Sequence, residues 1–257
     1  MISPGPSGVR EPMKGFPLTG CESNGEGFGH AGMCKTAVGR RQDKSRSRPH
    51  GGTRPPRGRF VACYPAEMNT AQETFAMVGK ESLWAAATRC HEALTAAGIP
   101  HALVGGVAVC LHGYQRTTVD VDLLVASGLN NQIRECLEAA GFAWDAEDRE
   151  FRDRSGVPLH LLVSGERAGK GSEVLLPDPS DPDAFDIIEG LPVATLARVI
   201  EMKVACGEGD LRRTHKDFAD VVELIAGHDL GPEFAARLHK AVRKTFRRLV
   251  KNARGQA

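Results

Sequence analysis

The sequence predicts an α+β (α/β-like) fold, in which a mixed β-sheet is flanked by helices and followed by a C-terminal helical region. Two observations predict this fold class. Between residues 80 and 190, helical apolar patterns alternate with short apolar strands, an order typical of a sheet covered by helices. After Pro192 the apolar spacing becomes helical. We expect the core domain at 80–190 and the helical region at 191–254.

The first 67 residues have a different composition from the rest of the chain. They are rich in Gly and Pro, contain more Lys and Arg than Asp and Glu, and show no apolar periodicity. Such a segment cannot bury enough apolar surface to offset the entropy of ordering it, so we expect residues 1–67 to be disordered. Two interpretations stay open: a start codon assigned too far upstream, with the working protein beginning at Met68, or a basic tail that binds nucleic acid.

The expected compartment is a reducing bacterial cytoplasm. No run approaches the 18 or so apolar residues that a membrane span needs, and the N-terminus lacks an apolar signal segment, so we expect no membrane partner. The seven cysteines are scattered and odd in number, and they lack C-x-x-C spacing, which argues against a disulfide framework and a zinc site. The net charge of +1 implies no nucleic-acid partner by itself.

The core elements follow from their apolar spacing and their glycine stops. Helical patterns that end near a glycine cover residues 82–97, 107–112 and 130–140. Short apolar or alternating runs predict strands at 101–104, 119–125, 142–144, 150–154, 158–163 and 185–188, with a further short strand at 173–176. After Pro192, Thr195 and Thr214 are expected to cap two helices, and Pro232 to open a third that runs to about residue 252.

The segment from residue 105 to residue 125 carries the chemistry; it reads GGVAVCLHGYQRTTVDVDLLV. Asp120 and Asp122 are two residues apart on a predicted strand, so both project from one face, with Cα atoms about 6.5 Å apart. Two carboxylates at that spacing can share Mg²⁺, which prefers one or two carboxylates together with substrate phosphates. Gly105 and Gly106 let a backbone approach a phosphate closely. The alternative is that both aspartates are solvated side chains on an exposed strand.

The order of these parts resembles the DNA polymerase-β-like nucleotidyltransferase superfamily, whose Gly-Gly turn and D-x-D pair bind nucleotide phosphates and metal. The segment is most similar to the small bacterial branch of AbiEii/AbiGii-type toxin nucleotidyltransferases. A second block supports the resemblance; it reads LARVIEMKVACGEGDLRRTHKDFADVVELI and contains Lys203, Asp217 and Asp220. The likeness covers about residues 85–227.

The resemblance implies roles for the residues of the second block. Lys203 would be the cation that neutralises a β- or γ-phosphate. Asp217 would be a catalytic carboxylate, although it also fits a capping box with Thr214. Arg116 could contact a substrate phosphate, or it could form an ion pair with one of the two strand aspartates.

The family usually carries a third carboxylate on a later strand, placed to activate the attacking hydroxyl. The predicted strand PLHLLV has His160 at that place. Imidazole is a poor Mg²⁺ ligand but can act as a general base near neutral pH. Asp153, on the preceding strand, is the alternative third carboxylate.

The last predicted helix is strongly basic on one face and apolar on the other. Its basic residues are Arg237, Lys240, Arg243, Lys244, Arg247, Arg248, Lys251 and Arg254. They are either a solvated face or a surface for the phosphates of an RNA or tRNA acceptor.

The resemblance therefore implies an Mg²⁺-dependent enzyme that moves a nucleoside monophosphate from an NTP to an acceptor hydroxyl of RNA, tRNA, a protein or a small molecule. Asp120 and Asp122 would hold one or two Mg²⁺ ions. The enzyme could be the toxin of a toxin–antitoxin pair, with a cognate antitoxin as partner. Two other classes stay open: a degenerate relative that binds nucleotide or RNA without catalysis, and a structural domain.

Overall fold

The structure, a computed structural model, describes residues 70–77 and 79–255, so the prediction for residues 1–67 lies outside it. The strands are β1 (His101–Val104), β2 (Val121–Val125), β3 (Ala143–Asp145), β4 (Glu150–Arg152), β5 (Pro158–Val163), β6 (Phe185–Ile188) and β7 (Leu191–Ala194). The α-helices are α1 (Ala71–Met77), α2 (Glu81–Ala96), α3 (Gly105–Leu111), α4 (Asn130–Ala139), α5 (Leu196–Gly209), α6 (Leu211–Gly227) and α7 (Arg243–Ala253). Two short 3₁₀-helices, η1 (Pro232–Arg237) and η2 (Lys240–Val242), precede α7.

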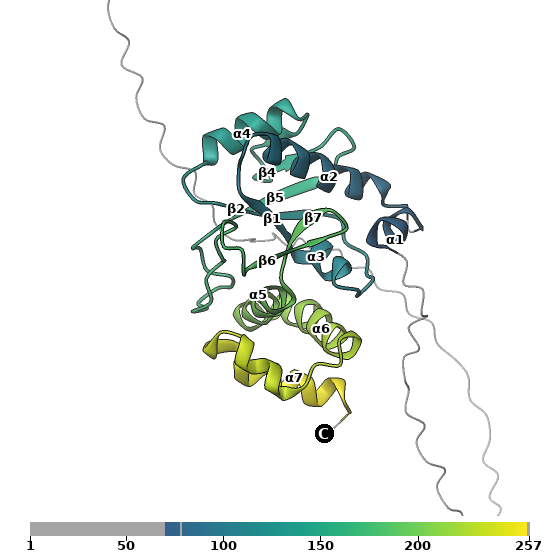
Figure 1. Cartoon of the computed structure of the whole chain (residues 1–257), viewed down its shortest axis with the longest axis vertical. Helices are drawn as coiled ribbons and strands as arrows, with labels where there is room; N and C mark the ends of the chain where they lie inside the picture. The colour runs from purple at the N-terminus through teal and green to yellow at the C-terminus, as the bar shows by residue number, and fades with distance from the viewer. Residues whose placement is uncertain (1–69, 78, 256–257) are drawn as a thin grey trace, which may run out of the picture. The chain divides into compact units, whose positions relative to one another are not determined.

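The strands form a seven-stranded mixed sheet in the order β3-β4-β5-β2-β1-β7-β6 (Figure 1). The central strand β2 pairs antiparallel with β1 and parallel with β5. A parallel neighbour requires a crossover, and here α4 and the β3–β4 hairpin provide it. Residues of β2 and β5 that are far apart in sequence therefore lie side by side.

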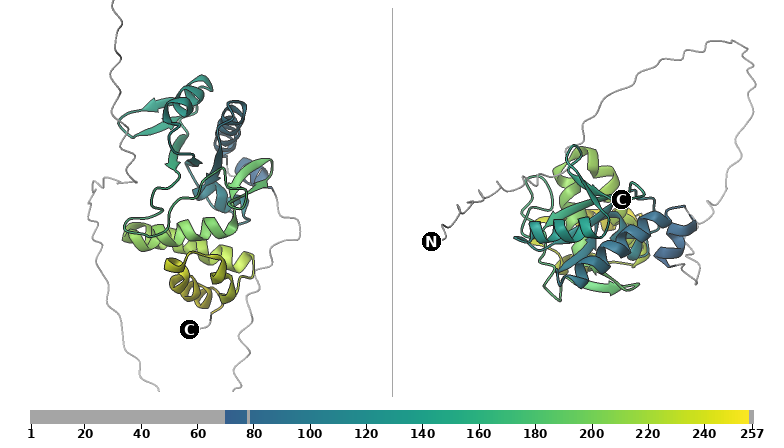
Figure 2. Two further views of the ribbon diagram at one scale, coloured as in Figure 1. Left: turned by 60° about the vertical axis from the view of Figure 1, so that its left-hand side comes forward. Right: turned by 90° about the horizontal axis from the view of Figure 1, so that it is seen from above.

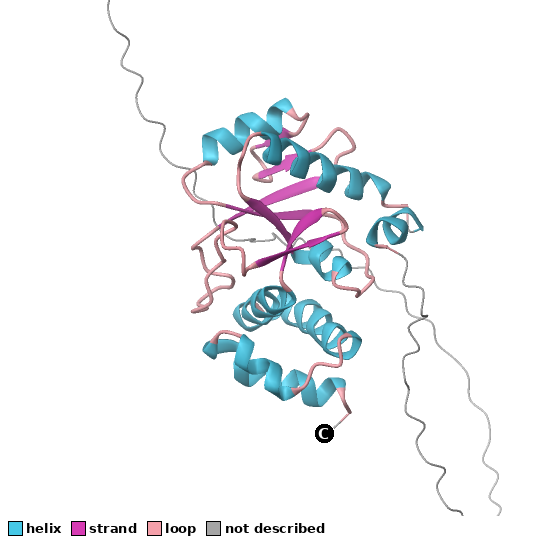
Figure 3. Ribbon diagram, in the orientation of Figure 1, coloured by secondary structure: helices cyan, strands magenta, loops and turns pink. Residues whose placement is uncertain are grey.

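Helices lie on both sides of this sheet, which confirms the α+β prediction. In Figure 1 and Figure 3, α2 and α4 lie on one side, and α3, α5 and α6 lie on the other. The left-hand view of Figure 2 shows the same separation, with α7 beyond α5 and α6. The chain thus continues from the sheet directly into a helical layer.

The strand predicted to carry both aspartates begins later than the sequence predicts, so that it contains Asp122 and Asp120 lies just before it. Val121 and Leu123 are fully buried, but Val119 is 59% exposed, so the alternation does not extend back to Val119. The reason lies in the neighbouring strand, because β1 ends at Val104, which pairs with Asp122. Beyond that pair β1 gives way to α3, and residues before Val121 have no ladder partner there.

The helix predicted to start at Thr214 begins at Leu211 instead. Asp210 is its N-cap, and its side chain accepts a hydrogen bond from the backbone N–H of Arg212. The hydroxyl of Thr214 donates to the backbone carbonyls of Gly207 and Asp210. The capping box between Thr214 and Asp217 was therefore wrong, since both residues lie inside the helix.

The helix predicted from Pro232 to residue 252 is divided into η1, η2 and α7. Leu238 and His239 have extended backbone, with ψ angles of 157° and 140°. The carbonyl of Leu238, left without a helical partner, accepts a hydrogen bond from Nε of Arg243 at 2.8 Å. A continuous apolar stripe hid this break from the sequence pattern.

Two smaller expectations also changed. The strand predicted at 173–176 is only an isolated bridge between Arg167 and Leu175. Apolar helical patterns around Cys90, Cys110, Cys136 and Cys206 predict four buried thiols; all four are free in the described part, but Cys136 and Cys206 are partly exposed. None of the helices that the structure describes is both long and apolar enough to cross a membrane.

Candidate metal and nucleotide site

The structure brings Asp120, Asp122 and His160 together at the point where β2 and β5 lie in parallel register. Asp122 and His160 are Cα partners across the two strands. Nδ1 of His160 lies 3.3 Å from Oδ1 of Asp122 and 3.9 Å from Oδ2 of Asp120. One ligand atom from each of the three residues lies within 4.8 Å of the others, and all three side chains are half-buried. This grouping could hold a divalent cation.

His160 has a third carboxylate neighbour that the sequence did not predict. Its Nε2 lies 2.8 Å from Oε2 of Glu150, a buried residue that also forms an ion pair with Arg152. The register that pairs Phe151 with Leu159 places Glu150 opposite His160 on the neighbouring strand β4. Glu150 could be identified only from the pairing of β4 with β5, because nothing in the local sequence distinguishes it.

Asp153, the alternative third carboxylate, does not join this group. Its Oδ1 accepts hydrogen bonds from the backbone N–H groups of Ser155 and Val157, and its Oδ2 pairs with Arg89 at 3.4 Å. The carboxylate thus stabilises the turn between β4 and β5 and fixes it to α2.

The contact between His160 and Asp122 shifts the pKa values of the two residues in opposite directions. The hydrogen bond to Asp122 is the largest cause that raises the pKa of His160 to about 9, against the effect of burial. Burial alone would raise the pKa of Asp122, but the hydrogen bond from His160 and the positive charges of Lys203 and Arg213 outweigh it. The pKa of Asp122 therefore lies below its usual value, and the carboxylate is ionised.

Gly105 makes room for Asp122. It has φ +62°, and an added Cβ would lie 1.8 Å from Oδ2 of Asp122. Val104 and Asp122 are cross-strand partners, so the first turn of α3 begins directly beside this carboxylate. A glycine is thus required here both for the left-handed backbone and for the close approach.

Gly106 makes room for Thr118, a residue of the segment that precedes β2. An added Cβ would lie 2.3 Å from Oγ1 of Thr118, which is buried and donates a 2.8 Å hydrogen bond to Oδ1 of Asp120. Thr118 therefore orients Asp120, and Gly106 leaves the space that Thr118 occupies. The Gly-Gly pair positions the two aspartates.

The charged residues of the second block form a largely buried ion network with Arg116. Nζ of Lys203 lies 2.8 Å from a carboxylate oxygen of both Asp217 and Asp220. Arg116 pairs with Asp220 at 2.8 Å, and Arg213 pairs with Asp217 at 3.1 Å. Three cations face two carboxylates, which leaves one positive charge in excess.

The residues of the ion network differ in their exposure to solvent. Asp217 is fully buried and the Lys203 side chain is only 7% exposed, whereas the Arg213 side chain is 42% exposed. Arg116 pairs with Asp220 rather than with Asp120 or Asp122. Arg213 is therefore the cation of the network with the most access to solvent.

The predicted basic face is present on α7 and the turn before it. Lys244, Arg247, Arg248 and Lys251 are exposed and have no ion-pair partner among the described residues. Arg243, by contrast, donates to the carbonyls of Leu238 and Ala236 and belongs to the fold. Together, Lys244, Arg247, Arg248 and Lys251 form the α7 basic face.

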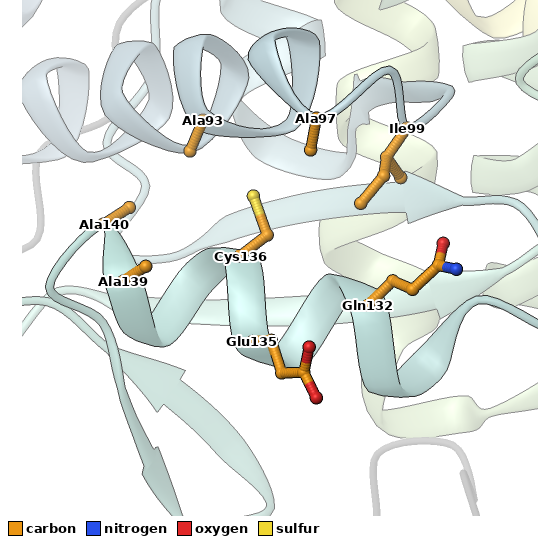
Figure 4. A pocket seen from close by; sticks show the side chains of 8 residues that line it. All are labelled: Ala93, Ala97, Ile99, Gln132, Glu135, Cys136, Ala139 and Ala140. Carbon is orange, nitrogen blue, oxygen red and sulfur yellow. The ribbon is translucent and has the colours of Figure 1, made fainter.

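A shallow hollow of about 650 Å³ lies elsewhere, between α2 and α4 (Figure 4). Small residues line most of it, and Cys136 points into it from α4. None of its lining residues belongs to the grouping around Asp122.

No protein-family model matches the sequence, and no curated protein is similar to it. Solved structures that resemble the fold include nucleotidyltransferases. ANT(2'')-Ia in complex with adenylyl-2''-tobramycin is 16% identical, with a TM-score of 0.42, and the match covers 63% of this chain and 94% of that one. An antigenic nucleotidyltransferase-like protein from Paracoccidioides brasiliensis is 18% identical, with a TM-score of 0.39 and coverage of 64% and 85%.

JHP933 from Helicobacter pylori is 16% identical, with a TM-score of 0.39, and the match covers 73% of this chain and 93% of that one. These likenesses are too distant to assign a function. The chemistry of the site rests on its own residues.

Gly105→Ala tests the close approach to Asp122. Both Gly105→Ala and its control Gly98→Ala place a side chain at positive φ, which costs about 1–2 kcal/mol. Only at Gly105 does the new methyl group collide with a neighbour, since nothing lies within 4 Å of a Cβ at Gly98. We expect Gly105→Ala to lower the free energy of unfolding in urea by about 1–3 kcal/mol more than Gly98→Ala. Equal losses would contradict the packing role.

Lys203→Met tests the ion network. The substitution leaves Asp217 and Asp220 buried with one cation each, so we expect the free energy of unfolding to fall by about 3 kcal/mol or more. Lys216→Met, at an exposed position of the same layer, should change it by less than about 0.5 kcal/mol. The measurement is urea unfolding followed by circular dichroism. A loss for Lys203→Met no larger than that of the control would show that the network is not structural.

Proposed function

We propose that the chain is a divalent-metal-dependent nucleotidyltransferase, which moves a nucleoside monophosphate from an NTP to an acceptor hydroxyl and releases pyrophosphate. The observation that carries the proposal is the convergence of Asp120, Asp122 and His160 beside the Gly-Gly turn. The sequence likeness to the polymerase-β-like superfamily points to the same chemistry.

The residues fit a metal ion at this place. Two half-buried carboxylates and a ring nitrogen offer ligand atoms close to one another, and Asp122 is held ionised. Asp120 and Asp122 would hold Mg²⁺, which when bound neutralises charge on the triphosphate. Thr118 and Gly105 would keep the two carboxylates in position before any substrate arrives.

The network beside Asp122 supplies the positive charge for the phosphates. Its excess charge favours an anion, and Arg213, the most exposed of its cations, is best placed to contact a phosphate directly. Lys203 would act on the phosphates through its field, because its ammonium group is paired with two carboxylates. We also propose that Gly105 and Gly106 let the phosphates approach backbone N–H groups. Arg116 is a further proposed phosphate contact.

Asp217 and His160 are the two proposed catalytic groups besides the aspartate pair. Asp217 is fully buried between Lys203 and Arg213, and both ring nitrogens of His160 lie against carboxylates. These contacts favour a positioning role over proton transfer for both residues.

A second function is a nucleotide- or RNA-binding protein without catalysis. The observation that favours it is His160, which occupies the place where the resembled enzymes carry a third carboxylate. The toxin role, with a cognate antitoxin as partner, is supported only by the sequence likeness to the AbiEii/AbiGii-type branch.

Asp122→Asn tests the enzyme. The substitution keeps the shape of the side chain and removes its charge, so we expect nucleotide transfer to fall by at least about 100-fold with the fold intact. The full chain is incubated with Mg²⁺, α-labelled NTPs and total bacterial RNA, and label on RNA is measured. Asp186→Asn, at an exposed position on β6, is the control and should keep full activity.

The outcomes separate the candidate functions. Wild-type transfer that Asp122→Asn retains would contradict the assignment of the site. Mg²⁺-dependent binding of NTP without transfer to any acceptor would favour the second function. The absence of both transfer and binding would leave a structural domain.

The α7 basic face is proposed to contact the phosphates of an RNA acceptor. The logarithm of the RNA association constant falls linearly with the logarithm of the salt concentration. We expect Lys244→Ala/Arg248→Ala to make this dependence on salt weaker, with the magnitude of the slope reduced by about 1.4 for single-stranded RNA, since each lost phosphate contact contributes about 0.7. The control Lys80→Ala/Lys170→Ala removes the same charge elsewhere. The measurement is fluorescence anisotropy of labelled RNA at several salt concentrations. An unchanged slope in the α7 variant would show that this face is only solvated.

A further inference from the structure

His160 adds a nitrogen to an otherwise carboxylate site. Asp122 lies on β2 and Asp120 lies just before that strand, and His160 lies beside Asp122 on β5 with Nδ1 turned toward both carboxylates. Among the residues that the structure describes, this is the group of His, Cys, Asp and Glu atoms close enough to share an ion. The donor set is therefore two oxygens and one imidazole nitrogen.

Glu150 fixes the orientation of this imidazole. Its Oε2 lies 2.8 Å from Nε2 of His160, and the carboxylate is buried and held by Arg152. In a neutral ring, a proton on Nε2 that is donated to Glu150 leaves the lone pair of Nδ1 directed at the aspartates. A carboxylate in this position is the usual partner of a metal-binding histidine, because it sets the tautomer and raises the basicity of the ring.

The donor set selects a class of metal. Mg²⁺ prefers oxygen ligands and binds imidazole poorly, whereas imidazole suits divalent ions of the first transition series. Two carboxylates keep the site compatible with Mn²⁺, which accepts both oxygen and nitrogen ligands. In a site specific for Mg²⁺, a histidine would occupy a coordination position with a ligand that Mg²⁺ binds weakly.

We infer that Asp120, Asp122 and His160 form a binding site for a divalent transition-metal ion such as Mn²⁺, in preference to Mg²⁺, and that Glu150 is the positioning residue that aims His160. The inference rests on the metal-site part of the proposed function and changes its metal. Glu150 is not one of the three grouped ligand residues, and it would act through the imidazole alone.

The test measures binding of Mn²⁺ alone and Mg²⁺ alone to the full chain by isothermal titration calorimetry, with the electron paramagnetic resonance signal of free Mn²⁺ as a second readout. We expect His160→Ala to weaken Mn²⁺ binding by about 10-fold or more and to change Mg²⁺ binding far less. Glu150→Ala should weaken Mn²⁺ binding by about 10-fold, and Glu150→Gln, which keeps an oxygen acceptor for Nε2, should recover most of that loss.

A double variant tests the selectivity directly. His160→Asp with Glu150→Gln makes an all-carboxylate site in which the new carboxylate does not face the charge of Glu150. We expect the ratio of the Mg²⁺ and Mn²⁺ dissociation constants to fall by at least about tenfold relative to the wild type. Glu135→Gln, at an exposed position on α4, is the matched control and should bind both ions as the wild type does. Circular dichroism checks that each variant is folded.

The outcomes separate this inference from the proposed function. If His160→Ala or Glu150→Ala weakens binding of both ions equally, or of neither, while Asp122→Asn abolishes binding, the selectivity is overturned and the aspartate metal site stands. If the wild type binds neither ion, with or without NTP, the metal site of the proposed function falls as well. A Glu150→Gln variant no better than Glu150→Ala would show that Glu150 acts through the fold instead of through the ring.

Discussion

The site depends on the contact between Asp122 and Gly105. Asp122 lies on the central strand, and Gly105 follows directly after its cross-strand partner. The carboxylate occupies the volume that a side chain at Gly105 would fill, so α3 can begin beside β2 only if residue 105 is a glycine. This one contact fixes where the carboxylate points, and the parallel partner His160 then approaches it from the other side. The Gly-Gly turn is thus part of the acidic site as well as the start of a helix.

The ion network explains how the sheet and the C-terminal helices act as one site. Arg116 comes from the segment before β2, Lys203 from α5, and their shared partner Asp220 from α6. Each buried carboxylate has two cations, and removal of Lys203 would take one cation from both carboxylates in a poorly solvated place. The positive field of Lys203 and Arg213 reaches Asp122 and favours its ionised form. The helical layer therefore has an electrostatic function in the site, beyond covering the sheet.

The parts of this arrangement that the sequence could predict are local. Periodicity 2 placed Asp122 on a strand, and glycine and helical spacing placed α2, α4 and α5 within a few residues of their ends. Glu150 could not be found in this way, because its relation to His160 arises from the register of β4 against β5. The false capping box had a similar cause. Thr214 and Asp217 have the spacing of a capping box, but Asp210, four residues earlier, is the N-cap of α6. The hydroxyl of Thr214 therefore donates to the backbone carbonyl of Asp210.

Two charge systems of opposite sign meet at Asp122, and this is what a triphosphate with a bound cation requires. On one side, Asp120, Asp122 and Glu150 surround a single imidazole, so the negative charge there stabilises a further cation. On the other side, the network has an excess positive charge, and Arg213 is partly open to solvent. A free cation would satisfy only the first system and a free phosphate only the second. A metal–nucleotide complex carries both charges in one ligand, and for this reason the proposed function accounts for the pairing better than a free cation or a free phosphate would.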